Sequence, residues 1–335
     1  MKFVNKNRIE GLKNIVRKEL TKYVNSDYVL LDLPNHRNIG DLLIWEGELS
    51  YLQEINHKLI YSCNLNTYQE SKISEGKVIL LHGGGNFGDV WKVNQEFRNN
   101  IISKFKNNRI IIFPQTIHYN NQGNLSRDAE LYNSHPDLII CVRDTVSYDL
   151  AKKHFYNCTI LLMPDMAFFV DLSSKQTKVK TNKTLIMRRY DKELGNVKLL
   201  NKIKQSLLSD GDMFEEKDWP GFYKEGTLIR RIQAYLIRAE IIGSKKLLKI
   251  PFLCQLVDDN HGLKNRNYKN KQINKGIKFI NEYDKVYSTR LHGFILSVLL
   301  NKEIFIFDNS YGKNKNFFNT WLSDFEKVKL IGDKG

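Results

Sequence analysis

The apolar residues of this sequence gather into short runs that alternate with segments of helical spacing. Strands buried on both faces form such continuous runs, whereas half-buried strands alternate polar and apolar residues. The first half therefore predicts a parallel sheet covered by helices on both faces. Its predicted strands are Tyr28–Leu33, Lys58–Ser62, Lys77–Leu81, Arg109–Phe113, Asp137–Val142 and Thr159–Met163, with helices over about 41–55, 90–106, 125–134 and 145–154.

The same alternation returns after a polar interruption. The stretch Ser173–Lys183 lacks apolar periodicity and is predicted to link two parts of the chain. Beyond it the pattern predicts strands at 184–187, 285–288 and 303–307 and helices at 273–282 and 291–300. We therefore predict an α/β fold with two Rossmann-like domains, over residues 1–172 and 183–315. A helix and tail at 316–335 follow, for which packing back on the first domain is one arrangement.

The stretch from Asp210 to Asn270 fits this alternation poorly. Within it, apolar residues recur at helical spacing and basic residues flank them. Such a basic amphipathic helix either packs on its own domain, which we prefer, or lies on an anionic bilayer surface. The apolar positions are Leu228, Ile232, Tyr235, Leu236, Ala239 and Ile242, and the basic ones are Arg230, Arg231, Arg238, Lys245, Lys246 and Lys249.

Composition and net charge limit where in the cell the protein is expected and which classes of partner it is expected to bind. The chain has 335 residues, of which 41% are hydrophobic, enough for two ordinary domains. It shows no transmembrane run and no apolar secretory segment, so we expect a cytoplasmic protein, with a peripheral position on the inner membrane face left open. The net charge of +15 suits nucleic acid, an anionic membrane or an anionic small substrate. Without a zinc-finger or RNP signature, nucleic acid is not expected.

Polar and glycine-rich residues follow the C-terminal ends of the predicted strands. Open α/β sheets bind ligands in the crevice outside those ends, so two such domains that face each other line one cleft. No grouping with metal-ligand spacing is present, and we expect no metal. The segments are Asn35–Asp41, His82–Asp89, Pro114–Thr116, Arg143–Asp144, Pro164–Asp165, Arg188–Arg189, Thr289–Gly293 and Asp308–Asn309.

Two of these segments suit an anion. Gly83-Gly84-Gly85 is predicted to open onto a helix, where bare N–H groups approach an anion closely, although a tight turn without a ligand also explains three glycines. Arg290-Leu291-His292-Gly293 places a fixed cation and an imidazole at a helix start, which suits a phosphate and a carboxylate on one small molecule. His292 is thus a candidate general acid, or alternatively a helix-start histidine bonded to backbone.

At these motifs the chain resembles the polysaccharide pyruvyltransferase family. The matching segments occur in the family's order and cover most of the chain. One departure is Thr289, where the family usually has an acidic residue. The segments are Asn38–Asp41, His82–Trp91, Phe113–Thr116, Arg143–Ser147, Pro164–Phe168, Arg189–Glu193, Thr289–Gly293 and Asp308–Lys313.

The resemblance implies a fold similar to the GT-B glycosyltransferases, with phosphoenolpyruvate as donor and no cofactor. The acceptor is then a sugar of a capsule, exopolysaccharide or cell-wall precursor, and a polyprenyl-lipid carrier for it is left open. Carried over by motif, Arg290 and His292 hold or protonate the donor, Arg143 clamps a second anionic group, and Lys313 adds a contact. The remaining expected binding residues are Gly84, Gly85, Asn86 and Asn309.

The base that takes the hydroxyl proton is expected to be Asp41 or Asp89, and a helix N-cap is the alternative role for each. Two other functions stay open. One is a glycosyltransferase of the same shape, which nucleoside diphosphates rather than phosphoenolpyruvate would stabilise. The other is a non-catalytic, membrane-associated scaffold of polysaccharide assembly, which would bind vesicles without turnover.

Overall fold

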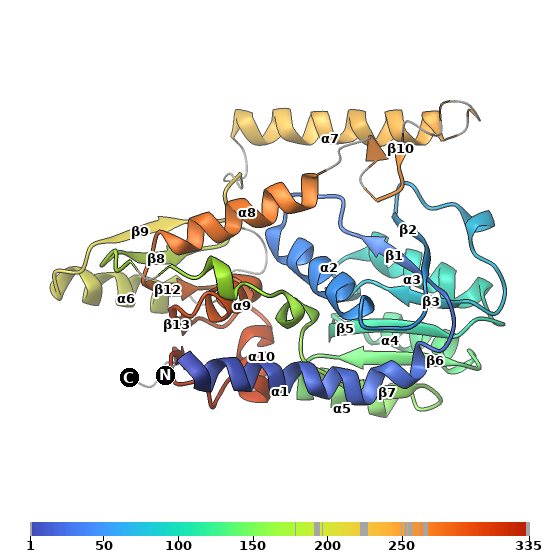
Figure 1. Ribbon diagram of the computed structural model, residues 1–335, viewed down its shortest axis with the longest axis horizontal. Helices are drawn as coiled ribbons and strands as arrows, with labels where there is room; N and C mark the ends of the chain where they lie inside the picture. Colours follow the sequence, from blue (N-terminus) through green and yellow to red (C-terminus); the bar gives the residue numbers. More distant parts are fainter. Residues whose placement is uncertain are drawn as a thin grey trace.

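The computed structural model describes residues 2–177, 179–190, 195, 197–221, 227–248, 250, 253, 257–260, 262–263 and 267–332. Two parallel β-sheets, one from each half of the chain, lie beside each other with helices packed against them (Figure 1). This architecture confirms the predicted α/β fold class with two Rossmann-like sheets. The motif residues 191–193 and Lys249 lie outside the described residues.

The first sheet has the strand order β2-β1-β3-β5-β6-β7, and the short β4 pairs with the end of β5. Successive residues of its central strands enter two different apolar clusters, so both faces are buried as predicted. The strands are β1 (Tyr28–Leu33), β2 (Leu59–Asn64), β3 (Val78–Leu81), β4 (Gly84–Gly88), β5 (Ile110–His118), β6 (Leu138–Val142) and β7 (Thr159–Leu162). Its helices are α2 (Ile39–Leu52), α3 (Lys92–Lys104), α4 (Gln122–Asn133) and α5 (Thr145–His154).

The second sheet has the order β14-β13-β12-β8-β9. Its edge strands β9 and β14 were not predicted, because a sequence such as Phe-Glu-Glu-Lys in β9 carries no apolar run. The strands are β8 (Thr184–Met187), β9 (Phe214–Lys217), β12 (Lys285–Ser288), β13 (Glu303–Ile306) and β14 (Val328–Leu330). Helices α6 (Val197–Ser209), α8 (Tyr268–Asn281) and α9 (Leu291–Leu299) belong to this half.

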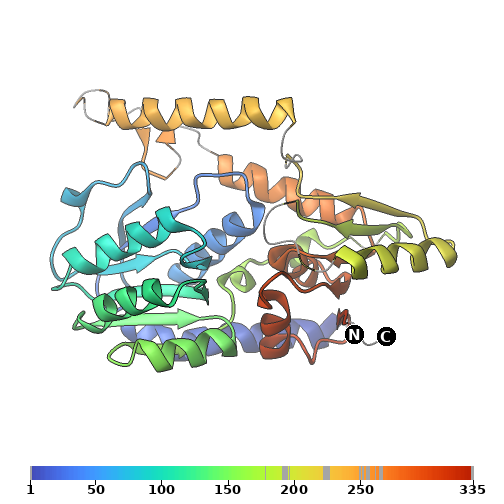
Figure 2. The ribbon, with the colours of Figure 1, turned by 180° about the vertical axis from the view of Figure 1, so that it is seen from behind.

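Two helices connect the halves. Helix α1 (Lys2–Leu20) runs along one side of the molecule beside both sheets (Figures 1 and 2). Arg17 of this helix pairs with Glu54 in the first half, while the Arg8 guanidinium lies 5.7 Å from the ring of Phe325 in the second. Helix α10 (Lys313–Trp321) contacts α5, and Trp321 Nε1 donates to the carbonyl of Arg143 at 2.8 Å. Because these helices contact both halves, the structure does not divide the chain at the predicted positions by itself. The domain bounds 1–172, 183–315 and 316–335 stay a prediction.

Helix α7 (Leu228–Leu247) lies outside both sheets, and its neighbours include the small hairpin of β10 (Val257–Asp258) and β11 (Gly262–Leu263) (Figure 1). The preferred prediction, that its apolar stripe packs on its own domain, is wrong. Leu228 is 71% exposed and Tyr235 is 73% exposed. None of the helices in the described part of the chain has the length and apolarity that a bilayer span requires.

Candidate active site

A cavity of about 810 Å³ lies where the C-terminal ends of strands from the two sheets meet. Its lining combines residues that follow β1 and β3 in the first sheet with residues that follow β8, β9 and β12 in the second. Six of the predicted site residues lie in this lining, namely Asp41, Gly85, Asn86, Arg290, His292 and Lys313. Gly84, Asp89, Arg143 and Asn309 are not part of it.

One buried carboxylate contacts two of the predicted site residues. Asp165 follows β7, accepts a hydrogen bond from Nη1 of Arg143 and lies 3.2 Å from Nε2 of His292. Burial favours the neutral form of Asp165, but the charges of His292 and Arg143 outweigh it and hold the pKa of this carboxyl well below its usual range. Asp165 is thus an anion that fixes the orientation of both the Arg143 and the His292 side chains. Asp165 lies in the segment Pro164–Phe168, but the sequence pattern assigns it no role, because its partners are distant in sequence.

Arg143 and Lys313 converge beside Gly85. Arg143 is fully buried, its Nε donates to Thr116 Oγ1 at 3.0 Å, and among the described residues its Nη2 has no hydrogen-bond partner. A Cβ placed on Gly85 would lie 3.1 Å from Arg143 Nη2 and 2.6 Å from Lys313 Nζ. Asn309 helps to place the lysine, since its Oδ1 accepts from the N–H of Lys313 at 2.7 Å. Two cations beside a residue without a side chain form a site suited to an anionic group.

The glycine segment is not the start of a helix. Gly84–Gly88 forms strand β4, and α3 begins only at Lys92. The prediction that bare N–H groups of a helix N-terminus cradle an anion here is therefore wrong. The N–H groups of Gly83, Asn86 and Gly88 donate instead to the side chains of Glu48 at 2.8 Å, Gln115 at 3.2 Å and Gln95 at 2.9 Å.

Arg290 and His292 stand at the start of α9, as predicted. Arg290 binds Asp218 through Nε and through Nη2, the latter at 2.7 Å from Oδ2, and both residues line the cavity. Asp218 belongs to the region without recognisable alternation, so no sequence pattern points to it. Thr289 joins strands β8 and β12, because its hydroxyl donates to the carbonyl of Met187 and accepts from the N–H of Arg189, each at 3.0 Å.

Asp41 faces the cavity, but it does not cap α2. The N-cap is Asn38, whose Oδ1 accepts from the N–H of Gly40 at 3.2 Å. Asp41 accepts from Asn38 Nδ2 at 2.6 Å and lies 3.5 Å from His36 Nε2. Burial opposes its ionisation, yet the charges of His36 and His292 lower the pKa of Asp41. Asp41 is therefore a carboxylate beside His292.

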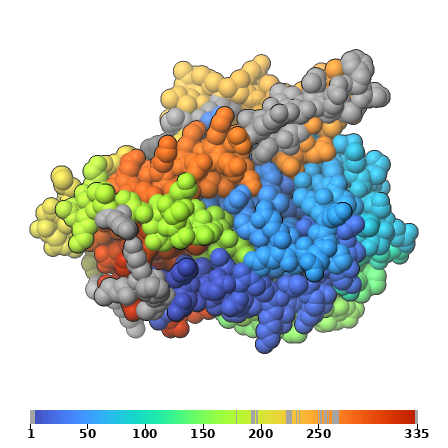
Figure 3. All heavy atoms as spheres, viewed as in Figure 1, coloured from blue at the N-terminus to red at the C-terminus, as the bar shows by residue number. Residues whose placement is uncertain are grey.

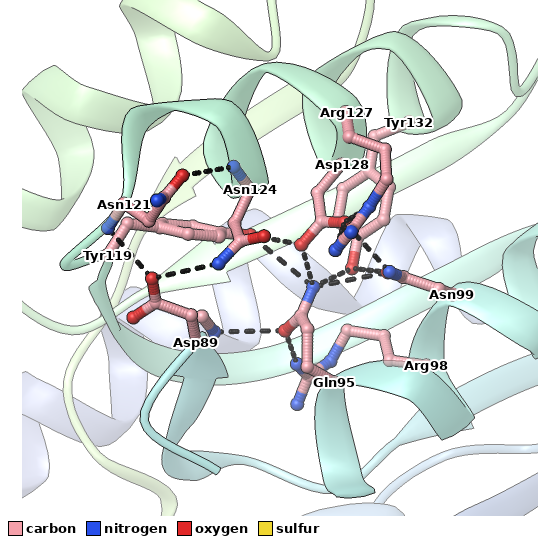
Figure 4. A network of polar contacts seen from close by, with 11 residues as sticks. Asp89, Gln95, Arg98, Asn99, Tyr119, Asn121, Asn124, Arg127, Asp128 and Tyr132 are labelled. Carbon is pink, nitrogen blue, oxygen red and sulfur yellow. Dashed lines mark hydrogen bonds and ion pairs between the residues drawn. The ribbon is translucent and has the colours of Figure 1, made fainter. Parts of the chain in front are cut away.

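Asp89, the other predicted base, is turned away from the cavity. Figure 4 shows it at the start of α4, where its oxygens accept from the N–H groups of Asn120 and Asn121, both at 2.8 Å, and from Asn124 Nδ2 at 3.3 Å. The structure thus does not bring it to the other site residues. It does not cap α3 either, whose N-cap is Trp91. Its role is to hold the loop before α4.

A second histidine of the cavity has a buried partner. His82 Nδ1 lies 2.8 Å from Oε2 of Glu48, which is fully buried, and His82 Nε2 is buried without a hydrogen-bond partner among the described residues. Burial lowers the pKa of His82, but the carboxylates of Glu48, Asp41 and Asp32 together raise it more, so the net pKa is raised. Glu48 sits in the middle of α2, where a sequence pattern gives no sign of such a role.

Comparison with known proteins identifies the family. The sequence profile described as polysaccharide pyruvyl transferase matches residues 38–311. This chain belongs to that family. EpsO of Bacillus subtilis (strain 168), provisionally named a pyruvyl transferase, is 31% identical over 97% of this chain and 93% of its own. Pyruvyl transferase 1 of Schizosaccharomyces pombe is 27% identical over 88% of this chain and 69% of its own.

A solved structure supports the fold of this pyruvyl transferase. An uncharacterised protein from Klebsiella pneumoniae superposes with a TM-score of 0.61 at 20% identity, over 96% of this chain and 98% of that one. The family makes the protein an enzyme that pyruvylates a polysaccharide or its sugar precursor. Membership of this family thereby favours the pyruvyltransferase over the two alternatives, a glycosyltransferase and a non-catalytic scaffold.

Asp32 lines the cavity of this pyruvyl transferase, and its ionised carboxylate is expected to destabilise the fold at neutral pH. Asp32 is 3% exposed, has a φ of 65° and accepts from Asn94 Nδ2 at 2.9 Å. Burial, opposed in part by Arg98 and His82, raises its pKa to about 6. A carboxyl with a raised pKa stabilises the fold below its unfolded pKa of about 4, and this contribution is lost as the pH rises through about 6.

We therefore expect Asp32→Asn to raise the free energy of unfolding by about 1 to 3 kcal/mol at about pH 8, because asparagine tolerates positive φ and carries no charge. The gain should shrink as the pH falls to about 4, where Asp32 is protonated in both states. Urea unfolding across this pH range measures it. A difference that does not change with pH would contradict the assignment.

Proposed function

We propose that this enzyme transfers the pyruvyl unit of phosphoenolpyruvate to two hydroxyls of one sugar as a ketal, in the cytoplasm and without a cofactor. The observation that carries the proposal is the pair of cations, Arg143 and Lys313, beside Gly85 and close to a histidine held by Asp165. Phosphoenolpyruvate carries two anionic groups next to an enol carbon that must be protonated. Cations beside an imidazole match that combination.

Cationic side chains around Gly85 bind the anionic groups of the donor. Arg143 Nη2, left without a partner in the described part of the chain, and Lys313 Nζ hold one anionic group. Arg290 lines the same cavity and adds positive charge for the second group, while Asp218 fixes its guanidinium. These charges lie in a largely buried setting, where they offset developing negative charge on the phosphate better than water does.

The reaction moves protons as well as the pyruvyl unit, and the protons lost by the sugar hydroxyls must equal those gained by the donor carbon and the phosphate. Carbon C3 of the donor gains one proton and C2 becomes electron-poor, so one sugar hydroxyl adds to C2 and the C2–O bond to phosphate breaks. The second hydroxyl then adds to C2 and closes the ring. The two hydroxyls lose two protons, of which one balances the proton gained by C3 and the other leaves on the phosphate.

The residues in the lining fit these proton transfers. His292 donates to C3 through Nδ1, since its Nε2 is held by Asp165. Asp41 and His82, which lie in the same cavity, accept the hydroxyl protons, and the buried Glu48 supports His82. Asp89 has no part in this scheme, because its oxygens hold the loop before α4. A closed ring of five or six atoms requires hydroxyls on adjacent or next-but-one carbons of the acceptor.

The proposal is tested by turnover in deuterium oxide with phosphoenolpyruvate and a panel of sugar diols, both free and linked to polyprenyl phosphate. We expect a ketal whose methyl group carries one deuterium, with one phosphate released per ketal. A product that keeps the donor's methylene group, or transfer that depends on a nucleotide-sugar, would contradict it.

A further inference from the structure

Helix α7 carries a broad apolar face that the rest of the described chain leaves uncovered. Six large apolar side chains of this helix are between 51% and 73% exposed. The two ribbon views place α7 apart from both sheets, and the part of it that is visible in the space-filling view lies at the edge of the molecule (Figures 1, 2 and 3). The six are Leu228, Ile229, Ile232, Tyr235, Leu236 and Ile242.

A stripe of positive charge borders this apolar face. Arg231, Arg238 and Lys245 recur every seven residues, so that they line up along the helix, and all three are exposed. The helix carries five basic residues and one acidic residue, Glu240. Glu240 lies on the opposite side, where it lines a small pocket with Arg37 and Tyr268. The outward side of α7 is therefore apolar and cationic together.

We propose that α7 lies flat on an anionic lipid bilayer. Its apolar side chains enter the boundary between headgroups and acyl chains, and its basic stripe meets the lipid phosphates, which is the arrangement of an interfacial amphipathic helix. The net charge of +15 adds long-range attraction to the same surface. A second copy of the chain fits this face less well than an anionic surface does, because it carries the same net charge of +15.

This placement orients the enzyme. The loop Asn35–Arg37 lines both the small pocket beneath α7 and the large cavity. A bilayer against α7 therefore lies next to one wall of the cavity. Membrane binding through α7 does not depend on the identity of the donor, because α7 contributes no residue to the lining of the large cavity within the described residues.

The test is co-sedimentation of the full chain with vesicles of phosphatidylcholine alone or mixed with phosphatidylglycerol. We expect binding to the anionic vesicles, weakened by salt, and little binding to the neutral ones. Arg231→Glu with Arg238→Glu should lower the partition coefficient by at least about 25-fold, since each basic residue near such a surface contributes about fivefold. Leu228→Ser with Tyr235→Ser should also abolish binding.

Matched variants elsewhere serve as controls. Lys152→Glu with Lys153→Glu changes the same charge on exposed positions of α5, and Leu208→Ser with Tyr156→Ser removes side chains that are 66% and 72% exposed. These pairs should bind vesicles nearly as the wild type does. Thermal unfolding and phosphoenolpyruvate affinity, which all four variants should retain, separate this test from that of the donor. Equal loss in control and α7 variants, no vesicle binding, or a dimer abolished only by the α7 changes would overturn the proposal.

Discussion

Replacement of His292 by glutamine is expected to lower kcat by roughly 10²- to 10⁴-fold, the usual range for loss of a positioned general acid. Glutamine retains a hydrogen-bond donor toward Asp165, which lies 3.2 Å from Nε2 of His292. It cannot supply a proton to carbon, so the chemical step suffers while the cations at Gly85 keep the donor in place. Single-turnover rates and calorimetry with phosphoenolpyruvate separate the two effects.

The control for this variant is His154→Gln in α5, which lies outside the cavity lining and should leave both quantities unchanged. If His292→Gln kept the wild-type kcat, another group would be the acid. If it lost donor affinity as severely as turnover, His292 would serve binding rather than proton transfer.

The substitution Gly85→Ala should reduce phosphoenolpyruvate affinity by at least about 100-fold, because it removes charge-assisted contacts of a few kcal/mol. The added Cβ would lie 2.6 Å from Lys313 Nζ and 3.1 Å from Arg143 Nη2, in the space assigned to the donor's anionic group. The fold should survive, since the end of the lysine side chain is able to move and Gly85 does not have a positive φ. Isothermal titration measures the affinity.

Gly11→Ala provides the matched control, since nothing lies within 4 Å of a Cβ at that position in α1. Both variants should unfold within a few degrees of the wild type, which excludes general damage as the cause. An unchanged affinity in Gly85→Ala would place the donor elsewhere in the cavity.

Local sequence patterns predicted most of the fold. The continuous Ile, Val and Leu runs of β1, β3, β5 and β6 correspond to strands buried on both faces, and such runs need no tertiary information to be recognised. The polar edge strand β9 lacks this signal, because three of its four residues are charged and Glu216 is held by an ion pair with the distant Arg188. For α7, a buried and an uncovered amphipathic helix share one sequence pattern, so only the tertiary structure distinguishes them.

The candidate site was predictable where its residues follow strand ends and not where they act through distant partners. Arg290 and His292 share one short motif and were identified together. Asp165, Glu48 and Asp218 are carboxylates whose partners are 22 to 127 residues away. The Asp165–His292 pairing joins the two halves, whereas the other three form between distant elements of one half. A single sequence does not encode either kind of pairing as a local pattern.

Calorimetric titration of phosphoenolpyruvate into the wild type and into Lys313→Met tests directly whether the cations beside Gly85 bind the donor. The substitution removes the charge but keeps most of the side chain. We expect one phosphoenolpyruvate per wild-type chain and a strongly reduced affinity in the variant, without loss of thermal stability. Equal affinity in both proteins, or a wild type that binds a nucleotide-sugar but no phosphoenolpyruvate even when a sugar acceptor is present, would contradict this expectation.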